Sequence, residues 1–487
     1  MLRNLLVHVS RYSLAGLMGS LAGLVSFPIL TRMLSVSDYG LLSLIVTTIT
    51  FVTAFGKSGL QFSIVRYYSD AESGKGKWNL ANYHSTIILG MLGIGTIVML
   101  LWALTVYILP ASIWAEPKLK YLFLITAILV LAEVSMSMMS GFLQAMQKSG
   151  WLSLFTVVER YGVLIFIVVT LFYISTSLES VIIARMIAQI TAILFLAYYV
   201  LRNIELNKSS FSPPMLKDML IYGIPLLGSE LAFIILSLGD RYIIQWKIGS
   251  EPLGIYSAAY NLCEYVQIML VVALFQAIRP MYFKLWSEEG EQATKDFINK
   301  SLYFYMMLCF PIIAGVAIVG PALLNLLTSG KYSEGAVVIP YVIAGLMIHG
   351  AHPMLGAGIF IKKSTILIWI TLAAAIVNII LNILLIPPFG IEGAAIATLL
   401  SYVFMTIVET IYGRRLLPVD FPFIASLKFL ALSLVMYFVL KQISMAGEVS
   451  TMIMQIIAGG VIYPTLLLAT DKKARTIVFE RVRDRLA

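Results

Sequence analysis

The sequence predicts an all-α polytopic membrane protein, and three observations carry that prediction. Hydrophobic residues make up 60% of the 487 residues and charged residues only 12%, whereas a soluble domain carries about 25% charged residues. The mean hydropathy is +0.92. Apolar stretches of about 20 residues, the length that crosses a bilayer core, recur along the whole chain. A water-soluble enzyme and a single-span receptor with a large ectodomain are therefore excluded.

The apolar stretches predict about 14 transmembrane helices joined by short loops, with no loop long enough for a separate folded domain. The first six begin near Tyr12, Tyr39, Asn82, Tyr121, Trp151 and Leu178. The next six begin near Leu220, Leu253, Leu302, Gly335, Thr365 and Glu392, and the last two near Phe423 and Val449. The first stretch has full spanning length and no small-residue cleavage site, so we interpret it as an uncleaved helix rather than a signal peptide.

The predicted tenth helix contains several helix-breaking residues. Pro340, Gly350, Pro353 and Gly356 lie within it, and proline and glycine are the usual causes of breaks in a transmembrane helix. We therefore expect a broken, hinge-like segment there. His349 and His352 in the same segment could share a face, but no Cys, Asp or Glu accompanies them in sequence, so we predict no metal site and no cofactor.

The distribution of basic residues predicts the orientation. With a cytoplasmic N-terminus, twenty-three Lys and Arg residues fall on the inner side and seven on the outer side. The outer seven are Arg32, Lys118, Lys120, Arg241, Lys247, Lys331 and Lys441. Because inner loops carry the excess of Lys and Arg, we expect a multi-pass protein of the cytoplasmic (inner) cell membrane with both termini in the cytoplasm. This topology also accounts for the net charge of +9 without a nucleic-acid partner.

The first two blocks of six helices resemble each other at a nearly constant offset. The motif from Leu34 to Ser43 matches that from Ile248 to Ser257, with Gly40 aligned on Gly254. Two further matches, of Lys148 with Lys363 and of Glu179 with Glu392, have offsets of 215 and 213. An even number of helices per repeat orients both copies alike, which predicts two parallel lobes with a substrate cavity between them and alternating access by rocking of the lobes.

The repeat sets the expected domain boundaries. We expect an N-lobe over residues 1–208, a C-lobe over 209–416, two further helices over 417–470 and a basic cytoplasmic tail over 471–487. In the tail, Val478, Val482 and Leu486 recur at helical spacing among basic residues. That pattern is typical of an amphipathic helix on an anionic inner leaflet.

Two segments resemble the polysaccharide-transporter branch, the O-antigen flippase (Wzx) type, of the multidrug/oligosaccharidyl-lipid/polysaccharide (MOP) flippase superfamily. They are Pro28 to Ser43 at the first hairpin and Asp240 to Tyr260 in the second repeat. The resemblance implies a V-shaped two-lobe bundle and not an enzyme. It also implies transport of lipid-linked oligosaccharides, typically on undecaprenyl diphosphate, from the inner to the outer leaflet for O-antigen, capsule or exopolysaccharide biosynthesis. Membrane lipids and polysaccharide polymerase or assembly proteins are the implied partners.

The candidate substrate-binding residues are basic groups at membrane depth or at the cytoplasmic mouth. Ionisable side chains inside a bilayer are costly and therefore usually functional, and a diphosphate favours guanidinium groups, which bind it in bidentate fashion. Arg185, about 12 Å into the predicted sixth helix, is the first candidate, followed by Arg160. Lys57 and Arg66 flank the mouth of the second helix. For Arg185, an internal ion pair with Glu159 is the alternative to ligand contact.

Four acids at similar depth either pair with these basic groups or bind H⁺ or Na⁺ for coupling. They are Glu133, Glu159, Glu230 and Glu264. Asp240 and Arg241 match the family motif, but we expect them to be structural. Cys263 and Cys309 both lie in apolar segments, where we expect them to be buried hydrophobic residues.

Three rival functions remain open. Two rivals share this architecture: a lipid II flippase and a cation-coupled multidrug exporter. A polysaccharide polymerase or glycosyltransferase would need sizeable outer loops with catalytic acids. The predicted outer loops are short. The loop over residues 111–120 contains one acid, Glu116, and the loop over residues 328–334 contains one acid, Glu334. No phosphate-binding glycine-rich nucleotide motif occurs, so direct use of ATP is not expected.

Overall fold

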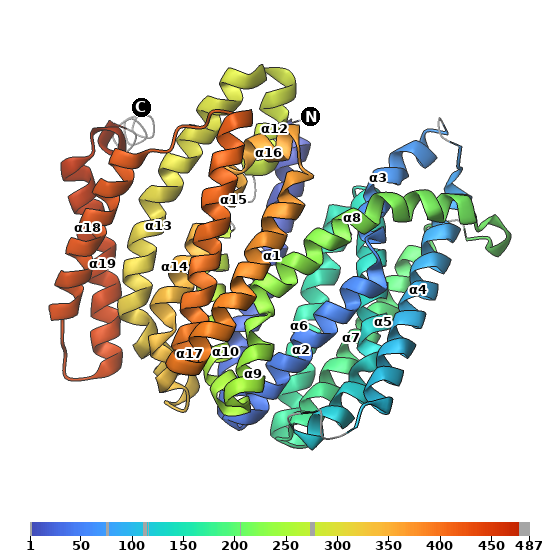
Figure 1. Ribbon diagram of the computed structural model, residues 1–487, viewed down its shortest axis with the longest axis horizontal. Coiled ribbons are helices and arrows are strands. Elements are labelled where there is room, and N and C mark those ends of the chain that lie inside the picture. The colour runs from blue at the N-terminus through green and yellow to red at the C-terminus, as the bar shows by residue number, and fades with distance from the viewer. Residues whose placement is uncertain are drawn as a thin grey trace. The chain divides into compact units, whose positions relative to one another are not determined.

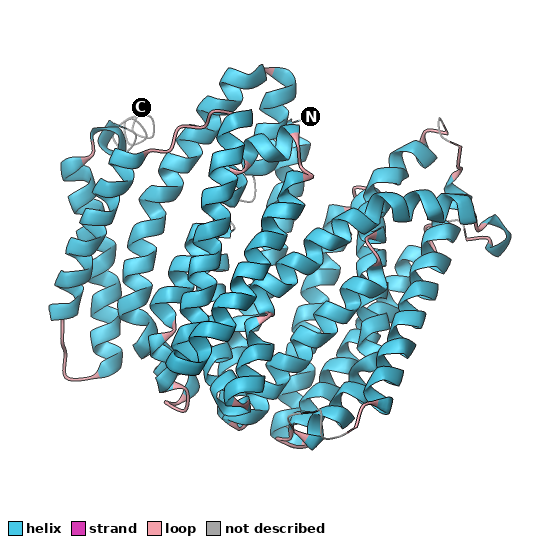
Figure 2. Cartoon of the chain, viewed as in Figure 1, coloured by secondary structure: helices cyan, strands magenta, loops and turns pink. Residues whose placement is uncertain are grey.

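The computed structural model describes residues 2–74, 77–110, 114, 116–204, 206–272 and 278–476. Every regular element in these residues is a helix, as Figure 2 shows. The predicted all-α, polytopic class is therefore confirmed. Contacts divide the chain into two units, which we describe separately. The first unit comprises Met1–Ser257, Ile268–Gln276 and Thr365–Ser401, and the second comprises Ala258–Gln267, Ala277–Ser364 and Tyr402–Ala487.

The first unit contains the helices from the N-terminus to the start of α10. They are α1 (Leu2–Met33), α2 (Val36–Lys57), α3 (Leu60–Glu72), α4 (Leu80–Ile108), α5 (Pro117–Ala145), α6 (Ser149–Tyr173), α7 (Leu178–Leu201), the 3₁₀ helix η2 (Lys208–Ser210), α8 (Pro213–Leu238) and α9 (Asp240–Ile248). α10 (Ser250–Gln267) begins here, and the π-helix η3 (Ile268–Val272) and the N-terminal part of α17 (Ile366–Leu416) also belong to this unit. α2 is the most enclosed of the spanning helices and packs against α4, α5 and α8.

Side-chain caps define where several of these helices begin. The Ser35 hydroxyl accepts a hydrogen bond from the Asp38 N–H at 3.0 Å, and Asn79 does the same for the Asn82 N–H at 2.8 Å. Each cap satisfies one of the backbone donors that the first helical turn leaves unpaired.

The second unit is built around α13 (Gly290–Thr328), which packs against α12 (Ile278–Glu288), α14 (Ile339–His349), α18 (Phe423–Gln442) and α19 (Glu448–Thr470). The 3₁₀ helix η4 (Ser333–Val337) precedes α14. α15 (His352–Leu355), α16 (Ala357–Lys362) and the C-terminal end of α17 complete the unit. Figure 1 shows α18 and α19 side by side at one edge of this unit.

Each of the predicted transmembrane segments has a helical counterpart, although only 11 described helices are long and apolar enough to cross a membrane by themselves. α17 accounts for two predicted segments, because it is kinked at Gly390 after Pro387 and Pro388. The predicted break in the tenth segment is present, since α14 ends at His349, α15 begins at His352 and α16 begins at Ala357. The eighth segment continues from α10 into η3.

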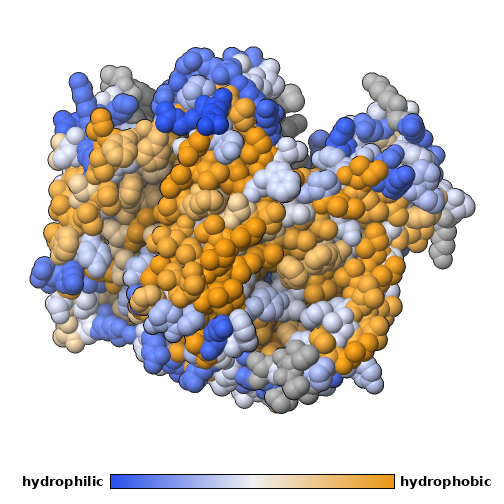
Figure 3. Space-filling view, in the orientation of Figure 1, coloured by the Kyte–Doolittle hydropathy of each residue, from blue (hydrophilic) through white to orange (hydrophobic). Residues whose placement is uncertain are grey.

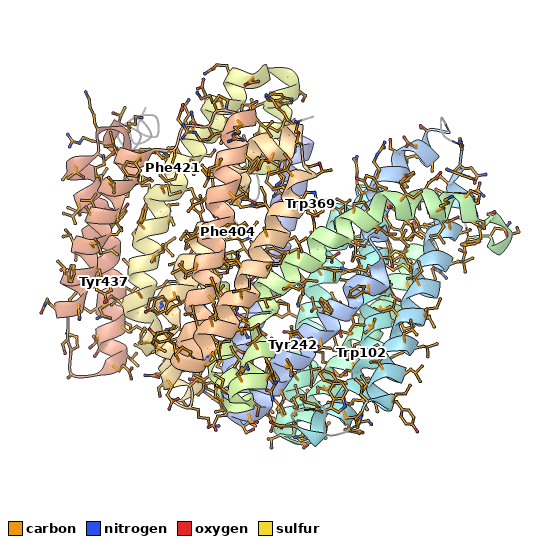
Figure 4. All side chains as sticks on the ribbon, viewed as in Figure 1. Trp102, Tyr242, Trp369, Phe404, Phe421 and Tyr437 are labelled. Atoms are coloured by element: carbon orange, nitrogen blue, oxygen red, sulfur yellow. The ribbon has the colours of Figure 1, made fainter. Side chains whose placement is uncertain are left out.

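The outer surface of the helices is strongly apolar. Figure 3 shows hydrophobic residues covering much of the visible face, with hydrophilic residues gathered at its upper and lower margins. Trp369, labelled in Figure 4, is 71% exposed. Exposed apolar surface of this extent on many helices is what a lipid-facing bundle requires. The chain is a multi-pass membrane protein.

The start of the C-terminal tail is anchored to the second unit. The Asp471 carboxylate accepts hydrogen bonds from Lys428 on α18 and from the Tyr303 hydroxyl on α13, the latter at 2.8 Å. Its Oδ1 also accepts from the Ala474 N–H at 2.8 Å, which caps the helical turn over residues 472–476. Val478, Val482 and Leu486, on which the amphipathic pattern depends, lie outside the described residues.

Candidate functional site

A polar cluster lies at membrane depth in the first unit, where α5, α6 and α7 pack together. It consists of Glu133 on α5, Glu159 and Arg160 on α6, and Arg185 and Gln189 on α7. Gln189 donates a hydrogen bond to Glu133 at 2.7 Å. The cluster contains two acids and two arginines and is therefore neutral overall. Mutual compensation of this kind makes ionisable groups tolerable inside a bilayer.

Arg185 lies near the carboxylates of this cluster without forming a direct ion pair. It lies within Coulombic range of Glu133, Glu159 and Arg160, yet no carboxylate among the described residues approaches its guanidinium within the 4.0 Å of an ion pair. The structural pair with Glu159 that the sequence left open as an alternative is therefore not a direct contact. The guanidinium donors of Arg185 remain available to an anionic ligand.

Glu159 pairs instead with its sequence neighbour. The Arg160 Nε lies 3.4 Å from Glu159 Oε2, and the Arg160 side chain is 59% exposed whereas that of Glu159 is 13% exposed. The stem of Arg160 passes close to α1, where a Cβ at Gly19 would lie 3.5 Å from its Cγ. Arg160 therefore presents a charged and exposed head group at a depth where charges rarely face lipid.

A second polar site lies where α2 and α3 meet α8. Lys57, the last residue of α2, forms an ion pair with Glu230 at 2.5 Å, and Gln61 on α3 donates to the other carboxylate oxygen at 2.6 Å. The side chains of Lys57 and Glu230 are 17% and 22% exposed. The backbones at the start of α3 and in α8 come very close here. A Cβ added at Gly59 would lie 2.0 Å from the Gly223 carbonyl oxygen, and a Cβ added at Gly223 would lie 2.6 Å from the Gly59 carbonyl oxygen. Gln61 is a site residue that sequence reasoning missed.

Two candidates remain, Arg66 in the first unit and Glu264 in the second. Arg66 pairs with Asp70 one turn further along α3, at 3.5 Å, and both side chains are more than half exposed. Exposed pairs of this kind contribute about 0–1 kcal/mol. Glu264 lies on the part of α10 that belongs to the second unit, and its side chain is exposed.

The two copies of the repeated glycine motif contact each other directly within the first unit. A Cβ at Gly40 on α2 would lie 2.2 Å from the Ser250 carbonyl oxygen, and a Cβ at Gly254 on α10 would lie 2.0 Å from that of Val36. Gly40 is separated from Gly254, and Val36 from Ser250, by the same 214 positions. The contacts are therefore reciprocal, as a two-fold relation between repeats requires, and only glycine allows the backbones to approach so closely.

Polar contacts surround this glycine crossing, on the side predicted to be extracellular. Ser37 and Ser250 are joined by a hydrogen bond of 2.7 Å between their hydroxyls, and Ser250 donates to Glu116. Lys118 at the start of α5 pairs with Asp38 on α2 at 3.1 Å and with Glu179 on α7 at 3.3 Å. We call this set, with Gly40 and Gly254, the outer crossing.

Asp240 and Arg241 form a buried network beside it. They are 1% and 3% exposed, and their side chains pair at 3.4 Å. Asp240 also accepts from the Tyr256 hydroxyl, and Arg241 Nε donates to Ser43 on α2 at 3.0 Å. Tyr242, labelled in Figure 4, donates to Thr48 on α2 at 2.7 Å. These contacts fix α9 against α2, which fits the structural role expected for this motif.

Comparison with known proteins agrees with this architecture. The model of the family described as "Polysaccharide biosynthesis protein" matches residues 5–286, more than half of the chain. A membrane protein of Methanocaldococcus jannaschii is 25% identical over 58% of this chain and 56% of its own length. A Haloferax volcanii protein named as the low-salt glycan biosynthesis flippase Agl15 is 22% identical over 38% of this chain and 39% of its own. An O-antigen transporter of Shigella flexneri is 22% identical over 46% of this chain and 53% of its own. The matches thus span about half the length of these relatives or less.

Two solved structures share the fold over most of the chain. The lipid II flippase MurJ in an inward closed conformation has a TM-score of 0.80 at 15% identity, with 96% of this chain and 99% of that chain covered. An inward-facing multidrug transporter of the MATE family, in the MOP superfamily, has a TM-score of 0.64 at 14% identity, with 84% and 97% covered. The match to the family model decides the assignment. This chain belongs to the polysaccharide biosynthesis protein family, with the fold of the MOP superfamily.

Proposed function

We propose that this chain is a flippase for lipid-linked oligosaccharides. It moves undecaprenyl-diphosphate-linked units from the inner to the outer leaflet of the cytoplasmic membrane for the biosynthesis of a surface polysaccharide, such as O-antigen, capsule or exopolysaccharide. Both termini lie in the cytoplasm. The transport proceeds by alternating access between the two faces of the membrane and is not an enzymatic reaction.

The observation that carries the proposal is the polar cluster. Arg185 has donors free of any direct ion pair among the described residues, and Arg160 presents an exposed guanidinium at similar depth. Guanidinium groups bind phosphate oxygens in bidentate fashion, and a diphosphate group crossing a bilayer needs such compensation because unpaired charge in hydrocarbon is costly. The family membership and the names of the Haloferax and Shigella relatives support the same cargo class.

The outer crossing supports the proposed mechanism. A flippase that loads from the inner leaflet needs a state closed on the outer side, and the direct contact of Gly40 with Gly254 and the Ser37–Ser250 hydrogen bond would close it there. In the state open to the outside these contacts would separate. The lobes over residues 1–208 and 209–416, with helices over 417–470 beside them, are the moving parts in this proposal.

Two other cargoes are carried by proteins of this fold. The MurJ structure is named as a lipid II flippase and the MATE structure as a multidrug resistance transporter, so the alternatives are a lipid II flippase and a cation-coupled multidrug exporter. A polymerase or glycosyltransferase is disfavoured, because Glu116 is engaged by Ser250 and Glu334 lies on the short 3₁₀ helix η4. In the described part of the chain, neither acid belongs to a large outer domain.

The test is a lipid analysis of cells that lack the gene. Lipid extracts of the deletion strain are analysed by mass spectrometry. The strain is complemented with the wild-type gene, with Arg185→Gln and with Arg415→Gln, which changes an exposed arginine in the last turn of α17 and serves as the control. Accumulation of undecaprenyl-diphosphate oligosaccharides, relieved by the wild type and Arg415→Gln but not by Arg185→Gln, supports the proposal. Accumulation of lipid II would contradict the cargo. Unpolymerised units already exposed at the outer face would favour a polymerase instead.

A further inference from the structure

The break between α14, α15 and α16 is braced by side chains from three other helices of the second unit. Gln267 on α10 donates to the Leu346 carbonyl at 2.8 Å, and the Tyr305 hydroxyl on α13 donates to the Met347 carbonyl. The Leu346 carbonyl also accepts from the Gly350 N–H at 2.9 Å, so the bond from Gln267 is an additional one at the end of α14. The third brace comes from α17 and differs from the other two because both of its partners are titratable.

This third brace joins His352, the first residue of α15, to Glu409. The His352 Nδ1 lies 2.7 Å from Glu409 Oε2. Glu409 is 0% exposed, and its second oxygen, Oε1, has no hydrogen-bonding partner among the described residues. A buried carboxylate with one oxygen unsatisfied is costly in its charged form, so this oxygen is a ready acceptor for a proton.

The surrounding groups do not provide a fixed positive charge for Glu409. His349 on α14 stacks on His352 with ring centroids 5.4 Å apart, and on Tyr402 of α17 at 4.8 Å. Arg279 on α12 lies over the Phe360 ring at 4.2 Å, and that ring contacts His352 edge-on at 4.9 Å. The Phe360 ring is therefore in contact with both the guanidinium and the imidazole.

Two other titratable groups on the helices packed against α15 have partners of their own. On α16, Lys362 pairs with Glu291 at 3.0 Å, and on α13 the Tyr305 hydroxyl donates to the Met347 carbonyl. On α12, Tyr282 is buried, and its hydroxyl has no hydrogen-bonding partner among the described residues. Within the described residues, the ionisable group in direct contact with the Glu409 carboxylate is His352.

We propose that His352 and Glu409 form a proton-binding site that is loaded and emptied during the transport cycle. In the loading step, an O–H bond forms at Glu409 Oε1 with a proton taken from water, while the Nδ1–H of His352 stays in place. The charge of the pair rises by one, and no electrons are transferred. In the unloading step the same O–H bond breaks and the proton returns to water. This inference rests on the proposed transport function, because it makes a proton the coupling ion.

The position of the site explains how such a proton could act on the conformation. His352 begins α15 directly after Gly350 and Ala351, and Gly356 separates α15 from α16. Neutralising the Glu409 carboxylate weakens its charge-assisted hydrogen bond to His352 and therefore loosens the link between α15 and α17. The bend at this break would then differ between the two protonation states.

The experiment measures proton binding directly and separately from transport. Infrared difference spectra of the purified full chain in lipid are recorded as the pH is lowered, for the wild type, Glu409→Gln, His352→Gln and the exposed-acid control Glu334→Gln. We expect the wild type and Glu334→Gln to show the C=O band of a buried carboxylic acid, and Glu409→Gln to lack it. In His352→Gln the band should persist and appear at higher pH, because the donor that favours the carboxylate is gone. The same band in Glu409→Gln as in the wild type would overturn the proposal, as would its absence from both the wild type and His352→Gln.

A second measurement connects the proton to transport. In proteoliposomes, an imposed pH gradient should change the flipping rate of the wild type and Glu334→Gln several-fold and leave that of Glu409→Gln unchanged. Equal responses of Glu409→Gln and the wild type would overturn the coupling role. If the infrared band behaves as expected but no variant flips a lipid-linked oligosaccharide, the proton site stands and the proposed cargo fails.

Discussion

Replacing Gly40 by alanine should open the outer crossing by a measurable amount. The added Cβ would lie 2.2 Å from the Ser250 carbonyl oxygen, and ordinary van der Waals contact begins at 3.4 Å, so the two backbones must separate by about 1.2 Å. The Ser37–Ser250 hydrogen bond of 2.7 Å would lengthen by a similar amount and be lost. Overpacking of a tight contact costs about 1–3 kcal/mol, which reduces the population of the closed crossing about 5- to 150-fold.

Cysteine crosslinking measures this change without any assumption about the cargo. The double variant Ser37→Cys/Ser250→Cys should form a disulfide on mild oxidation, because the two hydroxyls are already in contact and a disulfide needs side chains at this kind of distance. The native Cys263 and Cys309 are both buried and free, and single-cysteine variants control for them. Adding Gly40→Ala should slow the crosslinking reaction at least fivefold.

Gly93→Ala is the matched control, since a Cβ at Gly93 on α4 would have no heavy atom within 4 Å apart from its chain neighbours and the backbone of its own helix. It should leave the crosslinking rate unchanged. If Gly40→Ala crosslinks as fast as the parent, the close approach of α2 and α10 does not limit the crossing, and the argument from the repeated glycines is refuted.

Three further predictions concern single side chains. Arg185→Gln should weaken binding of a diphosphate-linked lipid to the purified protein about 10- to 150-fold, because a hydrogen bond to a charged group contributes about 1.5–3 kcal/mol. In the same binding titration, Arg185→Lys should recover only part of that loss. The stability of the ligand-free protein should show coupling between Lys57→Gln and Glu230→Gln. A double-mutant cycle should give a coupling energy of about 1–3 kcal/mol, between the values for exposed and buried pairs. Additive effects of the two substitutions would contradict the pairing. Burial raises the pKa of Asp471, but the hydrogen bonds from Lys428, Ala474 and Tyr303 outweigh it and hold the pKa below its ordinary 3.8. The stabilisation is therefore complete above about pH 4 and lost as the pH falls through the folded-state pKa, so the melting temperature of the wild type should drop more steeply on acidification than that of Asp471→Asn.

The transmembrane segments could be predicted from the sequence because hydropathy and length are local properties. The break in the tenth segment could also be predicted from the sequence, because Gly350, Pro353 and Gly356 lie within seven consecutive residues. The repeat predicted that Gly40 and Gly254 are equivalent. That the two glycines touch each other became visible only in three dimensions.

The partners of the ionisable residues could not be predicted, because each contact joins helices that are far apart in sequence. Glu230 pairs with Lys57 across 173 positions, and His352 contacts Glu409 across 57. In sequence, His352 lies three residues from another histidine, with no acid nearby. A charge at membrane depth signals that a partner exists, but only the packing of the helices identifies it.

A leaflet assay with the purified protein tests whether this chain moves a diphosphate-linked oligosaccharide across a bilayer. Proteoliposomes are prepared with an undecaprenyl-diphosphate oligosaccharide, and an added glycosidase that cannot cross the membrane reports the fraction in the outer leaflet over time. We expect the protected half to become accessible with wild-type protein, to do so more slowly with Arg185→Gln, and to stay protected in protein-free vesicles. If wild-type protein leaves the protected fraction as it is in protein-free vesicles, while lipid II is moved in the same assay, the cargo assignment is contradicted.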